Sequence, residues 1–309
     1  MQDSGRLPVA VVGAGAVGCY FGGMLARSGV PVTLIGRQPH VAAIARDGLL
    51  LETLRFREPV KVAAMTEIGA VRDARVVLFC VKTIDTEAAA RELQPHLRSG
   101  SVVISLQNGV DNTARIYSAA KIEAIPAVVY VACAMVAPGH VKHSGRGDLI
   151  IGDRKTADTA AIAALFEHAE VPCRVSESIE ADLWTKLIMN CAFNAISALG
   201  GSEYGRIVDF PLTRDLIARI VGEAVAVARA GGISLPEAAN VEAALQLGRD
   251  MSGATSSTAQ DIGRGRPTEI DSLNGYLVRR GAELGVPVPV NRTLHALVKL
   301  LEITATGTV

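Results

Sequence analysis

Short runs of apolar residues alternate with helical stretches through the first half of the chain. Four of these runs are rich in β-branched residues and lie at residues 9–12, 32–35, 76–81 and 102–105. Because the runs are apolar almost throughout, they predict strands covered on both faces, as in a parallel sheet. The intervals contain helical patterns at residues 17–28 and 86–93. This alternation is typical of a doubly wound α/β domain, the Rossmann arrangement.

The strand signals continue to residue 175 and then stop. Extra strands are predicted at residues 127–137, 140–143 and 149–151, followed by a helix at 157–169 and a strand at 172–175. A long helix then begins after an N-cap at residues 176–178, and further helices are predicted at 209–230, 236–250, 271–284 and 291–305. The sequence therefore predicts two domains, an α/β domain at residues 1–176 and an all-α domain at residues 177–309.

The composition argues against several classes of partner. The chain has 309 residues, which suits two domains, and 49% of them are hydrophobic, so a sizeable core can form. The 31 basic and 31 acidic residues balance, which argues against nucleic acid or an anionic membrane surface as the main partner. Five cysteines without a C-x-x-C pair indicate a reduced compartment. With no signal peptide or membrane span in the pattern, we expect a soluble, cytoplasmic protein.

The first predicted strand runs directly into a glycine-rich turn made of Gly13, Ala14, Gly15, Ala16, Val17 and Gly18. A G-x-G-x-x-G motif between a strand and a helix is the fingerprint of a dinucleotide-binding turn. Gly13 permits the tight turn, Gly15 lets the backbone approach a pyrophosphate, and Gly18 lets the helix pack on the strand. The helix N-terminus then faces the anion. The alternative is a glycine-rich turn that binds nothing.

Polar residues follow three other predicted strands, where ligands of open α/β sheets bind. Arg37 follows the second strand, at the place where an NAD-binding protein usually has a carboxylate. A guanidinium suits a 2′-phosphate, so we expect NADP(H), although a solvated loop arginine is the alternative. Lys82 could contact the cofactor or an acidic substrate, and Asn108 could lie near the nicotinamide. His143 is a conceivable proton donor, but we expect a half-exposed strand residue.

Lys186, Asn190 and Asn194 lie four residues apart in a stretch that is otherwise mostly apolar. On a helix this spacing places all three along one narrow stripe. A helix that is apolar nearly all round is normally buried, and a buried ammonium or amide needs a partner. A polar substrate is one such partner. A structural lysine paired with two core amides is the alternative.

A second polar cluster occupies residues 256–271. Thr268 can cap the helix that carries Glu269 and Asp271. Acidic residues in a first turn are favoured by the helix dipole, which explains both without any function. In a functional interpretation, one of the two carboxylates accepts a hydrogen bond from a substrate hydroxyl or from Lys186.

Together these motifs resemble the ketopantoate reductase (2-dehydropantoate 2-reductase) family over residues 9–302. The matching motifs are GAGAVG at 13–18, VK at 81–82, QNG at 107–109, W-x-K-x-x-x-N-x-x-x-N at 184–194, SSTAQDI at 256–262, PTEID at 267–271 and PVNRTLHALVKLLE at 289–302. The resemblance implies a Rossmann domain followed by a helical domain like the C-terminal domain of 6-phosphogluconate dehydrogenase. It also implies reduction of ketopantoate by NADPH, which gives pantoate for pantothenate and coenzyme A biosynthesis.

The resemblance also implies roles for individual residues. Lys186 would be the catalytic acid, and Glu269 would contact substrate or cofactor and help to set Lys186. Substrate binding would fall to Asn108, Lys186, Asn190, Asn194 and Ser257. NADP(H) would be held by the turn at residues 13–18 together with Arg37, Lys82 and Asn108.

Some positions depart from the family pattern, and alternatives remain. Ala195 stands where well-known members have proline, and Tyr204 and Ala254 lie near positions that carry asparagine in some members. The substrate could be another 2-oxo acid or a 3-hydroxy acid, and a sensor that binds NADP without turnover is a further alternative. The apolar helical half could bury a homodimer face or only its own core.

Overall fold

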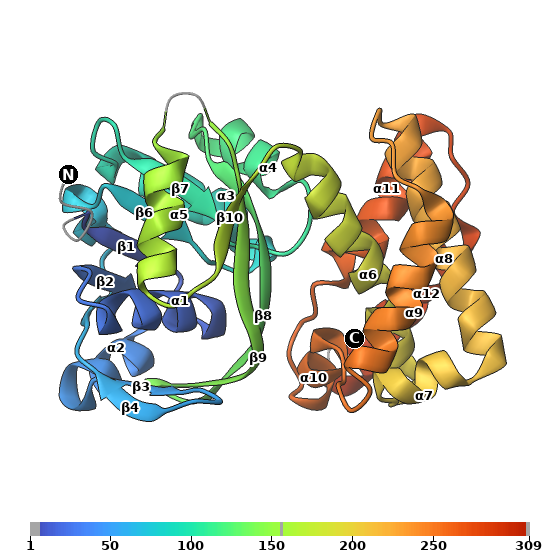
Figure 1. The fold of residues 1–309 in the computed structure, drawn as a ribbon, viewed down its shortest axis with the longest axis horizontal. Coiled ribbons are helices and arrows are strands. Elements are labelled where there is room, and N and C mark those ends of the chain that lie inside the picture. Colours follow the sequence, from blue (N-terminus) through green and yellow to red (C-terminus); the bar gives the residue numbers. More distant parts are fainter. Residues whose placement is uncertain (1–6, 155–156, 307–309) are drawn as a thin grey trace. The chain divides into compact units, whose positions relative to one another are not determined.

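In the computed structural model, which describes residues 7–154 and 157–306, the chain divides into two compact units. The first unit extends to Ile179 and the second begins at Glu180 (Figure 1). The outermost parts of the two predicted domains, residues 1–6 and 307–309, lie outside the described residues. None of the helices in the described part is both long enough and apolar enough to cross a membrane.

The first unit is built on a ten-stranded sheet. Its strands are β1 (Val9–Val12), β2 (Val32–Ile35), β3 (Leu49–Glu52), β4 (Arg57–Val60), β5 (Ala63–Met65), β6 (Val76–Phe79), β7 (Val102–Ser105), β8 (Ile125–Ala137), β9 (His140–Gly152) and β10 (Cys173–Ser176). The order is β4-β3-β9-β8-β7-β6-β1-β2-β5, and β10 pairs with β9. Strands β5, β2, β1, β6, β7 and β8 pair in parallel, whereas β8 and β9 are antiparallel. The carboxyl ends of β1, β2, β6 and β7 therefore share one edge of the sheet.

Helices cover both faces of this sheet. The helices are α1 (Ala16–Arg27), α2 (Gln38–Asp47), α3 (Thr86–Leu93), α4 (Asn112–Ala120) and α5 (Thr159–His168). Val9 and Val11 of β1 join a core that includes Phe21 of α1 and Phe166 of α5. The alternate residues of β1 join a second core, which contains Leu93 of α3 and residues of α4. Burial on both faces confirms the predicted doubly wound α/β fold (Figure 1).

Several elements of the first unit differ from the sequence pattern. The two runs predicted at residues 140–143 and 149–151 form one continuous strand, β9, which pairs with β8 through register shifts. Helices α2 and α4 and strands β3, β4 and β5 were not predicted. Only Ile44 is buried in α2, and two of the three residues of β5 are exposed, so these elements carry little hydrophobic signal.

The second unit is all-helical in its described residues, as predicted. Its helices are α6 (Ile179–Gly200), α7 (Tyr204–Asp209), α8 (Pro211–Ala230), α9 (Glu237–Asp250), α10 (Ser257–Gly263), α11 (Asn274–Leu284) and α12 (Pro289–Thr306). The helix predicted at residues 209–230 begins two residues later, at Pro211, and the short helix α7 before it was not predicted. Helix α10 was not predicted, and α11 begins three residues later than expected, after the short 3-10 helix Ile270–Ser272.

Candidate active site

In the turn between β1 and α1, two glycines are closely packed against the protein and the third, Gly15, faces open space. Gly13 has a φ of +104°, and a Cβ there would lie 2.7 Å from the carbonyl carbon of Cys80, so a side chain does not fit. At Gly18 a Cβ would collide with the carbonyl oxygen of Gly13 and lie 2.8 Å from Cγ1 of Val11. Gly15 is exposed, and nothing lies within 4 Å of a Cβ placed there. The turn is thus closely packed against the protein at Gly13 and Gly18 and open to solvent at Gly15.

The start of α1 can receive an anion at this opening. Gly15 is the N-cap residue and supplies no side-chain cap, and no acidic residue occupies the first turn. The N–H groups of the first turn, at residues 16–18, have no carbonyl partner within the helix and lie at its positive end. The N–H groups of Gly13 and Ala14 both donate to the Ile35 carbonyl at 2.9 Å, which ties the turn to β2. This geometry fits the pyrophosphate of a dinucleotide.

Arg37 lies just after the carboxyl end of β2, next to this turn. Val12 lies opposite Ile35 in the parallel pair of β1 and β2, and Arg37 follows as the N-cap residue of α2. The turn and this segment are in close contact, since a Cβ on Gly36 would lie 2.5 Å from Cβ of Ala14. Arg37 is exposed, and residues 36–40 contain no carboxylate. The edge therefore offers a guanidinium where a ribose 2′-substituent of a bound dinucleotide would lie.

Lys82 and Asn108 lie on loops that are hydrogen-bonded to each other. The loops follow β6 and β7, which pair in parallel and end side by side. Lys82 is exposed, whereas Asn108 is partly buried. The carbonyl of Asn108 accepts hydrogen bonds from the Thr83 hydroxyl at 3.3 Å and from the Asn112 side-chain amide at 2.7 Å. The structure therefore brings the predicted residues of the first unit to one edge of the sheet.

The predicted polar stripe of the second unit lies on α6. Lys186 and Asn190 are partly buried, and Asn194 is only 3% exposed. Leu187 and Ile188, on the other faces of the helix, are fully buried. The polar side chains thus lie along a helix that is packed into the core of its unit.

Asn194 and Ser257 are brought together although they are 63 positions apart. The Asn194 side-chain amide donates to the Ser257 hydroxyl at 3.4 Å, and Ser257 is exposed at the start of α10. Ser256 fixes this contact, because its hydroxyl accepts from the Ala259 N–H at 3.0 Å and donates to the Asn194 carbonyl at 3.2 Å. Ser256 belongs to the predicted polar cluster at residues 256–271 but received no role there, because the short helix α10 that it caps was not predicted.

Glu269 lies in a turn that is anchored to α12. Glu269 is partly buried and immediately precedes the 3-10 helix Ile270–Ser272. The helix predicted to carry Glu269 is wrong, because Glu269 is the N-cap residue of the 3-10 helix and lies outside it; the Thr268 hydroxyl accepts from the Ile270 N–H at 3.2 Å within this turn. The same hydroxyl and the Thr268 N–H both donate to Oε1 of Glu302. Thr268 therefore fixes both the turn and its distance from α12.

Asp271 strengthens the same anchor. It accepts hydrogen bonds from His295 at 2.7 Å and from Lys299 at 2.9 Å, both on α12. These contacts, the one with His295 above all, hold the pKa of Asp271 well below its usual range. Lys299 also pairs with Glu302 at 2.7 Å. Asp271 thus binds Lys299 and His295 of its own unit, and Glu269 remains the carboxylate of this motif that is proposed for chemistry.

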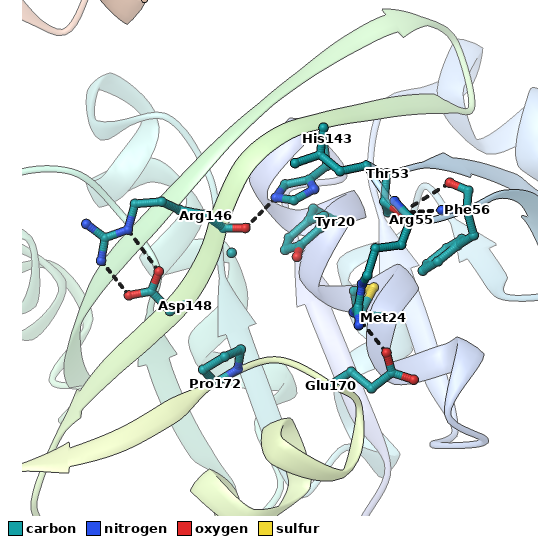
Figure 2. Close-up of a pocket in the computed structure, with 12 residues that line it drawn as sticks. Tyr20, Met24, Thr53, Arg55, Phe56, His143, Arg146, Asp148, Glu170 and Pro172 are labelled. Atoms are coloured by element: carbon teal, nitrogen blue, oxygen red, sulfur yellow. Dashed lines mark hydrogen bonds and ion pairs between the residues drawn. The ribbon is translucent and has the colours of Figure 1, made fainter. Parts of the chain in front are cut away.

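A cavity of about 420 Å³ lies in another part of the first unit, lined by α1, the β3–β4 turn and β9 (Figure 2). None of the predicted site residues except His143 lines it. His143 was expected to be half exposed, which is wrong: it is 8% exposed and stacks on Tyr20 with ring centroids 4.6 Å apart. It lies two residues after the buried Val141, on the same face of β9, and its Nε2 donates to the Arg146 carbonyl. Its Nδ1 is buried and has no partner among the described residues, so the cavity does not expose a proton donor there.

The cysteines supply no nucleophile. All are free, and burial raises the pKa of Cys19, Cys133 and Cys173 to about 12. Burial raises the pKa values of Cys80 and Cys191 as well. The thiols therefore remain protonated near neutral pH and act as small apolar residues.

Both halves of the chain match models of a single family. Residues 9–156 match the model described as ketopantoate reductase PanE/ApbA, and residues 178–302 match the model of its C-terminal part. The chain belongs to the ketopantoate reductase family. This confirms the resemblance that the sequence motifs indicated.

Known ketopantoate reductases are similar to this chain over nearly its whole length. The 2-dehydropantoate 2-reductase of Halobacterium salinarum is 35% identical over 308 residues, which cover 95% of this chain and 98% of that protein. A PanE/ApbA family ketopantoate reductase from Ralstonia eutropha JMP134 is 48% identical, and its crystal structure matches with a TM-score of 0.90 over 97% of this chain and 99% of that one. D-mandelate dehydrogenase, solved with NADH and anilino(oxo)acetate, shares the fold at 24% identity and a TM-score of 0.90, over 97% of this chain and 99% of that one.

Two departures from the ketopantoate reductase pattern are in contact with each other. The N–H of Tyr204 donates to the Ala254 carbonyl at 2.9 Å. The Tyr204 ring stacks on Phe193 with centroids 4.4 Å apart, and burial raises the pKa of its hydroxyl to about 12. Ala195 is fully buried in the same helix as Phe193. These positions are therefore part of the packed wall that flanks Asn194.

Proposed function

We propose that this protein is an NADPH-dependent reductase that converts 2-dehydropantoate to pantoate, a step towards pantothenate and coenzyme A. Family membership across both halves of the chain is the observation that carries the proposal. The relative from Halobacterium salinarum is named for this reaction. The open turn at the end of β1 supports cofactor binding, and the polar stripe on α6 supports binding of an oxo acid. The free cysteines are consistent with a cytoplasmic location.

The first unit would hold the cofactor at the shared edge of its sheet. The turn at residues 13–18 would bind the pyrophosphate through the first N–H groups of α1. Arg37 would pair with the 2′-phosphate, which is the basis for preferring NADPH over NADH. Lys82 and Asn108 would contact the remaining part of the dinucleotide, and Asn108 the substrate as well.

The second unit would supply the proton and the substrate contacts. The bound nicotinamide supplies a hydride to the carbonyl carbon of the 2-oxo acid. Lys186 would stabilise the negative charge that develops on the carbonyl oxygen and donate the proton. Asn190, Asn194 and Ser257 would bind the hydroxyl and carboxylate groups, and Glu269 would accept a hydrogen bond that sets Lys186. The donors of this set suit a small, anionic, hydroxylated oxo acid.

The test follows the nicotinamide absorbance of purified protein with ketopantoate and either NADPH or NADH. We expect fast oxidation of NADPH and slow oxidation of NADH. Arg37→Ala should weaken NADPH binding by about tenfold or more and leave NADH binding almost unchanged, because only the 2′-phosphate contact is lost. Rapid oxidation with other 2-oxo or 3-hydroxy acids but none with ketopantoate would move the function to a paralogous reductase. Binding of NADPH without oxidation across such a panel would favour a sensor.

A further inference from the structure

A buried hydrogen-bond chain lies beneath the loops that carry Lys82 and Asn108, and Gln107 is at its centre. The Gln107 side chain is almost fully buried, with 6% exposed. Its Oε1 accepts from the Ser105 hydroxyl at 2.9 Å. Its Nε2 donates to the Val81 carbonyl at 3.1 Å and to the Thr86 hydroxyl oxygen at 2.8 Å. Because the Val81 carbonyl can only accept, the orientation of this amide is fixed.

The chain continues from Gln107 to the backbone of the second loop. The Thr86 hydroxyl, which accepts from Gln107, donates to Oδ1 of Asn112 at 3.5 Å. The amide nitrogen of Asn112 donates to the Asn108 carbonyl at 2.7 Å. Thr86 is fully buried and Asn112 is 4% exposed, so solvent does not replace these partners. A hydrogen bond that is lost here leaves a buried polar group unpaired.

The two ends of this chain are the residues next to the proposed ligand contacts. Val81 immediately precedes Lys82, and the Asn108 carbonyl belongs to a ligand-contacting residue itself. The loops come from different strands, and 26 positions separate Lys82 from Asn108. Arg115 of α4 adds an outer brace, since it donates to the Thr83 carbonyl at 2.9 Å and pairs with Glu87 of α3 at 2.7 Å. Within this arrangement the Gln107 amide contacts both the β6 loop and the end of β7, and the Thr83 hydroxyl adds a direct but longer bond from the β6 loop to the Asn108 carbonyl.

We infer that Gln107 is a positioning residue that sets the spacing between Lys82 and Asn108. The inference rests on the proposed function, because it assigns cofactor and substrate contacts to those two residues. Gln107 itself is buried behind the loops and acts through the backbone at Val81 and through Thr86. Loss of its amide should therefore weaken cofactor binding and turnover together, without removing any group that touches the ligand.

The test compares Gln107→Glu with Gln107→Leu. An ionised glutamate has no donor for the Val81 carbonyl, and two oxygens would repel each other there. A protonated glutamate regains one O–H donor, and burial raises the pKa of such a carboxyl group. Relative to the wild type, we expect the glutamate variant to lose about tenfold in NADPH affinity near pH 8 and to recover most of it near pH 6. The leucine variant should show the loss at both pH values.

Thr159→Val is the matched control. Thr159 is 5% exposed in the same unit, and its hydroxyl donates to Asp153 at 2.7 Å, near the start of α5. The change removes the hydroxyl of a buried threonine and its part-buried bond without touching the β6 and β7 loops. Its NADPH affinity should equal that of the wild type even where its stability falls. A pH-independent defect in Gln107→Glu, or an equal loss of affinity in the control, would overturn the positioning role.

Hydrogen–deuterium exchange separates this inference from the proposed function. Faster exchange is expected at residues 81–86 and 106–112 in both Gln107 variants, and not in the Thr159 variant. If the wild type neither binds nor oxidises NADPH, the proposed function fails, and the exchange pattern alone decides whether Gln107 fixes the loops. Unchanged exchange in both segments would refute the inference whatever the enzyme assays show.

Discussion

Alanine substitutions at two glycines of the same motif should separate an effect on folding from an effect on cofactor binding. At Gly18 an alanine methyl group would overlap the carbonyl of Gly13, in the turn after β1, and crowd the side chain of Val11 in β1. Overpacking against backbone costs about 3 kcal/mol. For a unit of this size, about 2–4 °C of midpoint per kcal/mol gives a decrease of roughly 6–12 °C. Gly18→Ala is therefore expected to be a folding defect.

Gly15→Ala should have the opposite profile. Gly15 has φ −87° and ψ −166°, which alanine adopts freely, and a methyl group there meets no protein atom within 4 Å. Its stability should change by no more than about 0.5 kcal/mol. The methyl group would occupy the space proposed for the pyrophosphate, so NADPH affinity should fall by about tenfold to a hundredfold, equivalent to about 1.4–2.8 kcal/mol.

The assay measures thermal unfolding of both variants and titrates NADPH by fluorescence below the unfolding midpoint. NADPH should raise the midpoint of the wild type and hardly that of Gly15→Ala, because ligand stabilisation follows affinity. The reasoning is refuted if Gly15→Ala is as unstable as Gly18→Ala. It is also refuted if Gly15→Ala binds NADPH as tightly as the wild type does.

Three further predictions concern the second unit. Lys186→Ala should reduce turnover by about a hundredfold or more with NADPH binding nearly intact, and near-normal turnover in steady-state assays would exclude its role as the acid. The pKa of Asp271 is lowered, so its contribution to stability is present above the ordinary aspartate pKa of about 4 and is lost as the pH falls below that value. Asp271→Asn should remove this pH dependence from the free energy of unfolding, measured in urea at several pH values. The change in that free energy should be less than about 1 kcal/mol, because the side chain is half exposed. Ser256→Ala should cost about 1 kcal/mol or more through the lost cap on α10 and the lost bond to the Asn194 carbonyl, whereas Ser256→Thr, which keeps a hydroxyl that can both accept and donate, should retain more of the stability in the same unfolding assay.

The sequence predicted the central strands because burial leaves a direct hydrophobic signal. Strands β1 and β6 are buried at every position, and their runs of valine and leucine are easily recognised. Helix α2 and strands β4 and β5 were missed because half or more of their residues are exposed, whereas β3 has a short apolar run, with Leu49 and Leu51 buried, that was not assigned to a strand. Helix α10 has only seven residues and depends on contacts with α6, so periodicity could not reveal it.

Candidate site residues were predictable where they are local in sequence. The glycine turn and the stripe on α6 each lie within a dozen positions, so spacing alone indicates their geometry. The Gln107 network was not predictable, because its partners Val81 and Thr86 are 26 and 21 positions away. The burial of His143 follows the period of two in β9, because Val141 is buried on the same face, but the polar type of the residue favoured exposure.

The buried cysteines allow the transient opening of each unit to be measured separately. Cys19 and Cys173 lie in the first unit and Cys191 in the second, all of them buried and free. A protonated thiol shielded from solvent reacts with an alkylating reagent only while the surrounding structure is open. Pulsed alkylation followed by peptide mass spectrometry would therefore measure the opening rate of each unit separately, in a chain that carries no substitution. Comparing their rates with and without NADPH would show which half a bound cofactor holds closed.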